Sequence, residues 1–265
     1  IDRLVSISDT HNIKLILDNC DSLGSKWDGI DLSDYTVSSS CSFYPAHHIT
    51  TGEGGMVSSR KEEIVVLARS FAWWGRDCYC VGSANLLPNG TCKKRFDKWL
   101  PKSDVVIDHK YLFSNIGFNL KPLDLQGAIG IEQLKKFDEI HEKRRINKKI
   151  IANIIRRHVD GVRVINELEK AETSWFGVPV VCNTKDLKEK LKCFLAINRI
   201  QTRNYFAGNI LMQPAYRELD DASNYPTANG VLEKVFFVGC SPTYSQSMLS
   251  YFEQVMKQYA NYSSA

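Results

Sequence analysis

The feature that most restricts the fold of this chain is a short apolar run that ends in a carboxylate, KLILD at residues 14–18. A run of this length and composition is typical of a buried strand in a parallel sheet. In open α/β sheets, ligands bind beyond the carboxyl ends of the strands, and Asp18 stands at that position. The run therefore predicts an α/β domain with a candidate ligand-binding carboxylate. On its position alone, the alternative to ligand binding is that Asp18 is a solvent-exposed carboxylate in a turn.

Strand-like and helical patterns alternate along the first part of the chain. Two β-rich runs, at 35–43 and 54–60, flank a turn that contains two adjacent histidines, and residues 61–74 have helical spacing. Residues 75–104 are irregular and contain three cysteines. A loop of this length in a compact domain needs either a function or an internal staple.

A long helical pattern separates this part from a C-terminal part. Pro122 opens the pattern, which continues to about residue 157. Strands and helices follow it, at 161–165, 175–182, 185–198, 235–240 and 245–260. We therefore predict part of a large α/β domain over 1–121 with a cysteine loop at 75–104, a bridging helix over 122–157, and a small α+β domain over 158–265.

Composition and charge narrow the possible partners. The chain is 43% hydrophobic and 24% charged, and its net charge of +4 is spread along the sequence, which argues against a nucleic-acid partner. The densest basic cluster, at 93–99, is expected to be a solvated loop or a contact for an anion or a partner. No apolar run approaches the roughly 20 residues of a membrane span, so we expect no membrane partner. No signal peptide is visible and Ile1 falls within a helical pattern, so we expect a fragment of a cytoplasmic protein.

The chain has eight cysteines, and this even number permits disulfides. A chain this long without a signal peptide nevertheless favours a reducing compartment, where grouped cysteines more often bind metal. Cys182, Cys193 and Cys240 lie in apolar runs, and we expect them to be buried small hydrophobic residues. We expect Cys41 to be buried as well.

The stretch SFYPAHHITTGEGG at 42–55 carries a more specific signal. Together with LDNCDSLGS before it and GFNLKPLDLQGAIGIEQL after it, it resembles the sugar aminotransferase family of fold type I pyridoxal-phosphate enzymes. The family pattern is Asp-x-x-(His/Gln), then Ser-Phe-x-x-x-Lys-x-(Ile/Leu)-Thr-x-x-Glu-Gly-Gly, then Gly-x-Asn-x-(Lys/Arg)-x-x-Asp-x-Gln-Ala-Ala. The resemblance covers most of residues 14–135 and implies the large domain of that fold, present in part, with a C-terminal α+β domain.

The resemblance implies roles for individual residues. Asp18 matches the acid that pairs with the pyridinium nitrogen of the cofactor, and Ser42 matches the hydroxyl that binds its phosphate. Asn119 matches a residue that reaches the cofactor phosphate of a neighbouring subunit, which implies a homodimer. Asp21 replaces a His or Gln of relatives, and Tyr44 precedes the turn. Both either orient the cofactor or pack against the protein.

The family lysine stands five residues after the matched serine, and here that residue is His47. Lysine both attaches the cofactor covalently and moves a proton. Imidazole cannot form the covalent bond but can move a proton near neutral pH. The resemblance and this change together imply pyridoxamine phosphate held without a covalent bond, and removal of a hydroxyl beside a ketone instead of amino transfer. His48 matches a position usually occupied by Asn, which implies a structural or substrate-contact role.

The grouped cysteines resemble the cluster ligands of the hexulose-3-dehydrases in this family. Cys20 and Cys78 are separated by 57 residues, Cys78 and Cys80 by one, and Cys92 follows after eleven instead of the usual seven or so. The resemblance implies a 2Fe-2S cluster on these four thiolates, while zinc or no metal remain open. It also implies C-3 dehydration of a CDP-linked 4-keto-6-deoxyhexose for 3,6-dideoxysugar and O-antigen synthesis, with electrons from an NADH-dependent flavin/iron–sulfur reductase.

Three other functions remain open from the sequence. A cluster-free nucleotide-sugar 3-dehydratase and a sugar aminotransferase belong to the same class, and an iron assay separates them from the cluster enzyme. A non-catalytic metal-binding fragment belongs to another class. The groups that hold the phosphate in relatives precede the first strand and are not visible here, so we expect the isolated chain to bind cofactor weakly and to be inactive.

Overall fold

The computed structural model describes residues 1–78, 94–97, 99–100 and 102–263. The chain forms two compact units. The first comprises Ile1–Cys20 and Leu32–Gln133, and the second comprises Asp21–Asp31 and Leu134–Ala265. None of the helices in the described part combines the length and apolar character needed to cross a membrane.

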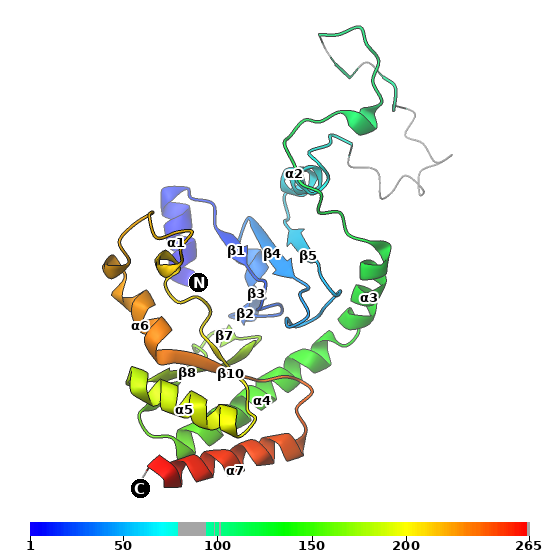
Figure 1. Ribbon diagram of the computed structural model, residues 1–265. Helices are drawn as coiled ribbons and strands as arrows, with labels where there is room; N and C mark the ends of the chain where they lie inside the picture. The colour runs from blue at the N-terminus through cyan, green and yellow to red at the C-terminus, as the bar shows by residue number, and fades with distance from the viewer. Residues whose placement is uncertain (79–93, 98, 101, 264–265) are drawn as a thin grey trace. The chain divides into compact units, whose positions relative to one another are not determined.

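The first unit contains a three-stranded sheet in the order β1-β4-β5 (Figure 1). Strand β1 (Ile16–Asp18) runs parallel to β4 (Ser38–Ser42), and β5 (Gly55–Ser58) is antiparallel to β4. The helices of this unit are α1 (Asp2–His11), η1 (Leu32–Tyr35), α2 (Glu62–Ala72), η4 (His109–Tyr111) and α3 (Asp124–Leu134). The predicted strands at 14–18, 35–43 and 54–60 are thus confirmed.

The expectation that the first strand is buried was wrong. Ile16 is 67% exposed, and Asp18 is exposed as well. The reason is that β1 is an edge strand among the described residues, where its one pairing partner is β4. An apolar run of this length predicts a strand, but its burial depends on neighbours that the run does not specify.

Two segments that are distant in sequence pair closely and will be called the clamp, residues 70–77 with residues 112–120. The Trp74 amide donates to the Phe118 carbonyl at 2.8 Å, and the Asp77 amide donates to the Leu112 carbonyl at 2.9 Å. The two segments approach so closely that a Cβ on Gly117 would lie 2.2 Å from the Gly75 nitrogen. The clamp joins the chain that enters the cysteine loop to the chain that leaves it.

The second unit contains an antiparallel sheet in the order β6-β8-β10-β9 and a small sheet in the order β3-β2-β7. The strands are β2 (Lys26–Trp27), β3 (Ile30–Asp31), β6 (Val162–Val164), β7 (Ala171–Glu172), β8 (Gly177–Cys182), β9 (Thr202–Asn204) and β10 (Val235–Gly239). The helices are α4 (Phe137–His158), α5 (Lys185–Ile197), η5 (Ile210–Met212), η6 (Ala222–Asn224), α6 (Pro226–Lys234) and α7 (Gln246–Ser263).

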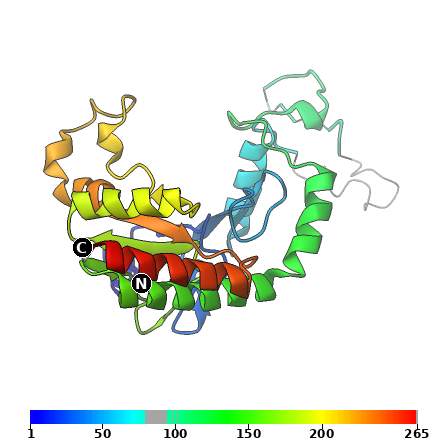
Figure 2. The ribbon, with the colours of Figure 1, turned by 60° about the horizontal axis from the view of Figure 1, so that its bottom comes forward.

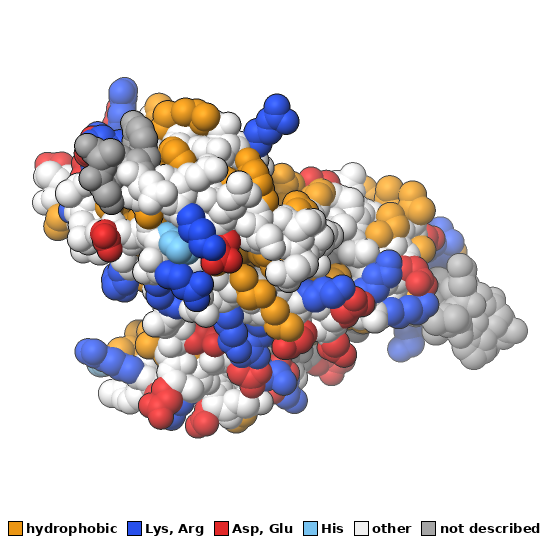
Figure 3. All heavy atoms as spheres, turned by 90° about the horizontal axis from the view of Figure 1, so that it is seen from below, with side chains coloured by type: hydrophobic (Ala, Val, Ile, Leu, Met, Phe, Trp, Pro, Cys, Tyr) orange, Lys and Arg blue, Asp and Glu red, His pale blue; other side chains and the backbone are white. Residues whose placement is uncertain are grey.

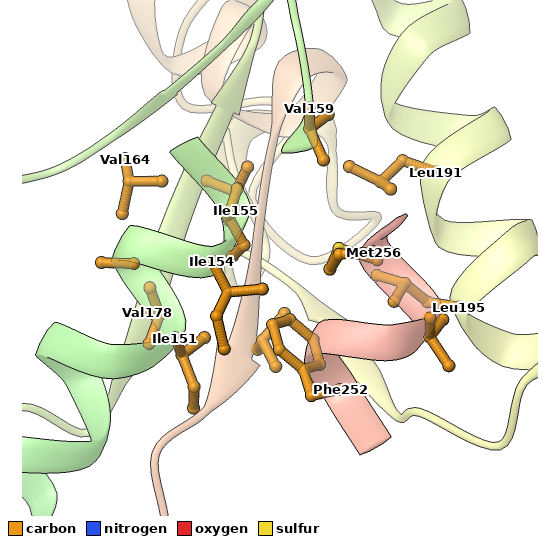
Figure 4. Close-up of a cluster of buried hydrophobic side chains, with 14 of the residues drawn as sticks. Ile151, Ile154, Ile155, Val159, Val164, Val178, Leu191, Leu195, Phe252 and Met256 are labelled. Carbon is orange, nitrogen blue, oxygen red and sulfur yellow. The ribbon is translucent and has the colours of Figure 1, made fainter. Parts of the chain in front are cut away.

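The core of the second unit lies between its larger sheet and helices α4, α5 and α7. Helices α4 and α7 run side by side (Figures 1 and 2). Figure 4 shows Ile155 of α4, Leu191 of α5 and Met256 of α7 among the side chains of this cluster. All three are 2% exposed or less, and burying an aliphatic side chain of this size stabilises the fold by about 1.5–3 kcal/mol.

The single bridging helix predicted over 122–157 is two helices, α3 and α4, with a break at Lys135 and Lys136. Each helix packs in a different unit, so the apolar pattern does not have to be continuous across the break. The sequence carries a signal for the second start, because Asp138 and Glu139 lie in the first turn of α4, where acidic side chains favour the positive end of the helix dipole.

Basic and acidic side chains are interspersed over the face shown in Figure 3. On α4, Lys143 pairs with Glu139 at 2.6 Å. On α7, Glu253 pairs with Lys257 and with Arg157 of α4, each at 3.3 Å. Exposed pairs of this kind contribute about 0–1 kcal/mol each, so the apolar core, not the charged surface, holds these helices together.

Candidate active site at the ends of strands β1 and β4

The candidate site begins with Asp18, the last residue of β1. Its Oδ1 accepts a hydrogen bond from the Cys20 amide at 3.2 Å and another from the Ser40 hydroxyl at 3.1 Å. The pKa of the Asp18 carboxyl is lowered, first by the Cys20 thiol, then by the Cys20 amide, the Ser40 hydroxyl and the charge of His47, while burial acts in the opposite direction. The site therefore presents an ionised and exposed carboxylate.

The turn after β4 brings three further predicted residues to this edge of the sheet. Ser42 ends β4, and its Oγ accepts a hydrogen bond from the Tyr44 amide at 3.1 Å. The His47 amide donates to the Tyr44 carbonyl at 2.9 Å, which closes the turn across Pro45. The Tyr44 and His47 rings meet edge to face, with 5.5 Å between centroids. The turn and the ring contact together restrict the orientation of the His47 imidazole.

The glycine-rich stretch after the histidines has a structural explanation. Gly54 has φ +148°, a conformation that favours glycine, and a Cβ on Gly55 would lie 2.9 Å from the Cys41 carbonyl oxygen. The Glu53 carbonyl accepts hydrogen bonds from Thr51 at 2.6 Å and from Gln126 of α3 at 2.7 Å. The stretch therefore fixes the turn against α3. His48 is only 4% exposed, which points to the structural one of its two expected roles.

Asn119 and Asp21 are placed differently from these residues. Asn119 pairs with Trp73 in the clamp and is exposed. Asp21 begins the segment that belongs to the second unit. The contacts described for this part of the chain do not join either residue to Asp18 or His47, so their expected contributions to the site remain predictions.

Two of the four predicted cluster ligands lie within the described residues. Cys20 follows β1, with its Sγ 3.7 Å from Ser40 Oγ, and Cys78 follows the clamp and is 5% exposed. Cys80 and Cys92 lie outside the described residues. Among the residues that the structure does describe, no group of three or more His, Cys, Asp or Glu side chains is arranged to hold a metal ion.

The isolated cysteines behave as expected with one exception. Cys41, Cys182 and Cys240 are buried, and burial raises the pKa of each thiol to about 11. Cys193 is exposed, so the expectation that it is buried was wrong. In α5 the core-facing residues are Leu191 and Leu195, and a residue two positions from each projects from the opposite side of the helix.

Two polar contacts near Cys20 and Cys78 were not predicted from the sequence. Ser40 lies opposite Asp18 in the parallel pair of strands, a register that no local pattern reveals. Asp77 accepts hydrogen bonds from Ser114 at 3.2 Å and lies 2.8 Å from the ring of His109, which stacks on Trp99 at 3.8 Å between centroids. The second contact joins Asp77 and Trp99, both within the predicted cysteine loop, to residues that follow the loop.

The chemistry of these side chains fits a pyridoxal- or pyridoxamine-phosphate cofactor. The ionised Asp18 carboxylate suits a protonated ring nitrogen. The Ser42 hydroxyl, which accepts from a backbone amide, keeps its own hydrogen for donation to a phosphate. The His47 imidazole is close enough to Asp18 to influence that carboxyl electrostatically. The residues present would hold the ring and one phosphate contact.

The chain matches a known family model over residues 1–257, described as the DegT/DnrJ/EryC1/StrS aminotransferase family. Lipopolysaccharide biosynthesis protein RfbH of Salmonella typhimurium is 34% identical over 252 residues, which are 92% of this chain and 56% of that protein. The dTDP-4-dehydro-2,6-dideoxy-D-glucose 3-dehydratase of Saccharopolyspora spinosa is 33% identical over 270 residues, 99% of this chain and 57% of that protein. The chain thus spans a little over half the length of these curated relatives.

Solved structures confirm the predicted fold class, an α/β fold of the type I aminotransferase kind. The E. coli GDP-4-keto-6-deoxy-D-mannose-3-dehydratase with bound hydrated PLP has a TM-score of 0.77 and 26% identity, covering 97% of this chain and 63% of that one. Aminotransferase TlmJ from Streptoalloteichus hindustanus has a TM-score of 0.78 and 17% identity, covering 99% of this chain and 62% of that one. The second likeness shows the fold alone.

Proposed function

Because this chain belongs to the DegT/DnrJ/EryC1/StrS aminotransferase family, we propose that the intact protein is a cytoplasmic enzyme that removes the C-3 hydroxyl of a nucleotide-linked 4-keto-6-deoxyhexose with pyridoxamine phosphate. The activity is that of a CDP-6-deoxy-L-threo-D-glycero-4-hexulose-3-dehydrase. The similar proteins from Saccharopolyspora spinosa and E. coli, both named as 3-dehydratases, support the reaction class. Because those names specify dTDP and GDP sugars, the CDP group rests on the cysteine resemblance alone.

The observation that carries this proposal is the position of His47. A histidine stands where the family pattern has lysine, in the turn that follows Ser42 at the end of β4. When bound, the cofactor supplies an amine that condenses with the substrate ketone and a ring that accepts electron density. Asp18 keeps the proton on the ring nitrogen, Ser42 binds the phosphate, and His47 takes the proton from the C4′ carbon as a general base. Tyr44 orients the imidazole through the edge-to-face contact.

The second part of the proposal is a 2Fe-2S cluster held by Cys20, Cys78, Cys80 and Cys92. Dehydration followed by reduction to a 3-deoxysugar requires two electrons, and zinc has no redox chemistry to supply them. We propose that an NADH-dependent flavin/iron–sulfur reductase provides these electrons. The sequence spacing and the placement of Cys78 directly after the clamp support this part, and the described residues alone do not form a metal site.

The third part of the proposal is a homodimer in which Asn119 contributes to the partner's site. Large apolar side chains close to Asn119 are exposed in this chain, among them Phe118 at 66%, Leu120 at 68% and Leu123 at 62%. Exposed apolar patches of this kind mark surfaces that another protein covers. Light scattering of the intact protein tests this part, and an active monomer at assay concentration contradicts it.

The test of the catalytic role uses the intact protein, purified without oxygen and supplied with pyridoxamine phosphate. His47→Asn is expected to abolish exchange of the C4′ proton with solvent while cofactor binding persists, because histidine does not attach the ring. The control is His11→Asn, at an exposed histidine at the end of α1, which should exchange as the wild type does. Borohydride treatment should leave no cofactor on the protein, and pyridoxyl-lysine would refute the proposal.

The test of the cluster is iron and sulfide analysis of the same protein. We expect two irons and two sulfides for each chain, and Cys78→Ser should remove the visible absorption and the reductase-dependent turnover. The control is Cys193→Ser, at an exposed cysteine of α5. An iron-free protein that is active and releases ammonia would replace this proposal with the cluster-free dehydratase. Supplying CDP-, GDP- and dTDP-linked substrates in parallel identifies the nucleotide.

A further inference from the structure

Ser40 touches both a proposed cofactor-binding residue and a proposed metal ligand. It lies in the middle of β4, opposite Asp18 in the parallel register. Its hydroxyl donates to Asp18 Oδ1 at 3.1 Å and lies 3.7 Å from Cys20 Sγ. The Ser40 carbonyl also accepts from the Asn19 amide at 2.9 Å, so backbone pairing fixes the serine in this position.

The direction of these hydrogen bonds follows from counting hydrogens. A serine hydroxyl has one hydrogen and two acceptor lone pairs. Because Ser40 gives its hydrogen to the Asp18 carboxylate, this bond has a fixed direction. The Cys20 thiol contacts the same hydroxyl and also acts on the Asp18 carboxyl directly, so the three side chains form one cluster around the carboxylate.

We propose that Ser40 is a positioning residue that holds the Asp18 carboxylate for the cofactor. This inference rests on the proposed binding of the cofactor ring at Asp18. Without the Ser40 hydroxyl, Asp18 Oδ1 keeps the hydrogen bond from the Cys20 amide and loses the one that comes from the neighbouring strand.

A polar neighbour on the same strand provides a matched control. Ser39 is 5% exposed, and its hydroxyl bonds to the Ser58 hydroxyl at 2.7 Å, on the opposite face of β4. Removing the Ser39 hydroxyl therefore perturbs the strand without touching Asp18 or Cys20. Because threonine and valine have nearly the same shape, Ser40→Thr and Ser40→Val differ mainly in the hydroxyl. Both are good strand formers, so a folding defect affects the two equally.

The experiment measures the affinity of the intact, metal-free protein for pyridoxamine phosphate by calorimetry and the absorption band of bound pyridoxal phosphate. Loss of a hydrogen bond to a charged group should weaken binding about tenfold in Ser40→Ala and Ser40→Val. Ser40→Thr and Ser39→Ala should bind as the wild type does. Circular dichroism confirms that each variant is folded.

A second background separates the role of Ser40 from that of the Cys20 thiol. Ser40→Val should also weaken binding about tenfold in a Cys20→Ala background, because the Ser40 hydroxyl donates to Asp18 without the thiol. Equal affinities for Ser40→Thr and Ser40→Val in either background overturn the positioning role. If the wild type itself binds no cofactor, or if Asp18→Asn binds it unchanged, the proposed function fails, and this outcome differs from the first.

Discussion

Gly117→Ala should strongly destabilise the first unit, because it adds one methyl group to the tightest backbone contact in the clamp. A Cβ on Gly117 would lie 2.2 Å from the Gly75 nitrogen and 2.7 Å from the Phe71 carbonyl oxygen. Both neighbours are backbone atoms, so no side chain can turn aside to make room. Ordinary contacts of this kind are 3.4–4 Å, so the two segments have to separate by about 1 Å or more.

The size of the effect follows from the bonds that this separation stretches. The Phe118 amide donates to the Phe71 carbonyl at 2.7 Å, and the Trp74 amide donates to the Phe118 carbonyl at 2.8 Å. Each such bond contributes about 0.5–1.5 kcal/mol net, and overpacking adds about 1–3 kcal/mol. The free energy of unfolding should therefore fall by about 2–6 kcal/mol, a large part of the 5–15 kcal/mol typical of a domain.

Urea unfolding followed by tryptophan fluorescence measures this loss, because Trp73 and Trp74 lie in the clamp itself. The control is Gly127→Ala in helix α3, where a Cβ meets no atom within 4 Å. Alanine is a better helix former than glycine, so the control should be more stable by up to about 1 kcal/mol. If Gly117→Ala unfolds at the same urea concentration as Gly127→Ala, the argument from backbone contact is wrong.

Two further expectations concern the second unit. At pH 8, iodoacetamide should label the exposed Cys193 in minutes and should label Cys182 and Cys240 roughly a hundredfold more slowly. The reason is that the thiolate is the reactive form and burial raises the pKa of the Cys182 and Cys240 thiols to about 11. Equal labelling rates for the three cysteines, measured by mass spectrometry, would contradict this expectation. Burial also lowers the pKa of Lys148 below 10.5, so its unfolded state binds more protons, and stability should rise with pH between the folded-state pKa and 10.5. Lys148→Met should remove that rise. If the free energies of unfolding of the wild type and of Lys148→Met, each measured with urea, change with pH in parallel, the lysine does not cause the rise.

The sequence predicts most of the secondary structure of the second unit because its core positions follow a regular spacing. Leu191 and Leu195 face the core four residues apart in α5, and Val178 and Val180 lie fully buried in β8. Such patterns are local, so they can be recognised in the sequence without knowing which other segments pack against the helix or strand. Asp138 and Glu139 mark the start of α4, but the break before it also depends on which unit each helix joins, and that choice is made by tertiary contacts.

The candidate site likewise has one part that the sequence predicts and another that it does not. The strand end and the family motif predict which residue types stand at 18, 42 and 47, because a motif is a sequence property. They do not predict that Asp18 lies opposite Ser40, since register across a parallel pair is set by the whole sheet. The run SSSCS in β4 is polar and contains no evident motif, yet the Ser39 hydroxyl bonds to Ser58 and the Ser40 hydroxyl donates to Asp18. Serine is not among the β-branched and aromatic residues that favour strands, so side-chain partners on both faces give the strand a stabilisation that its composition does not predict.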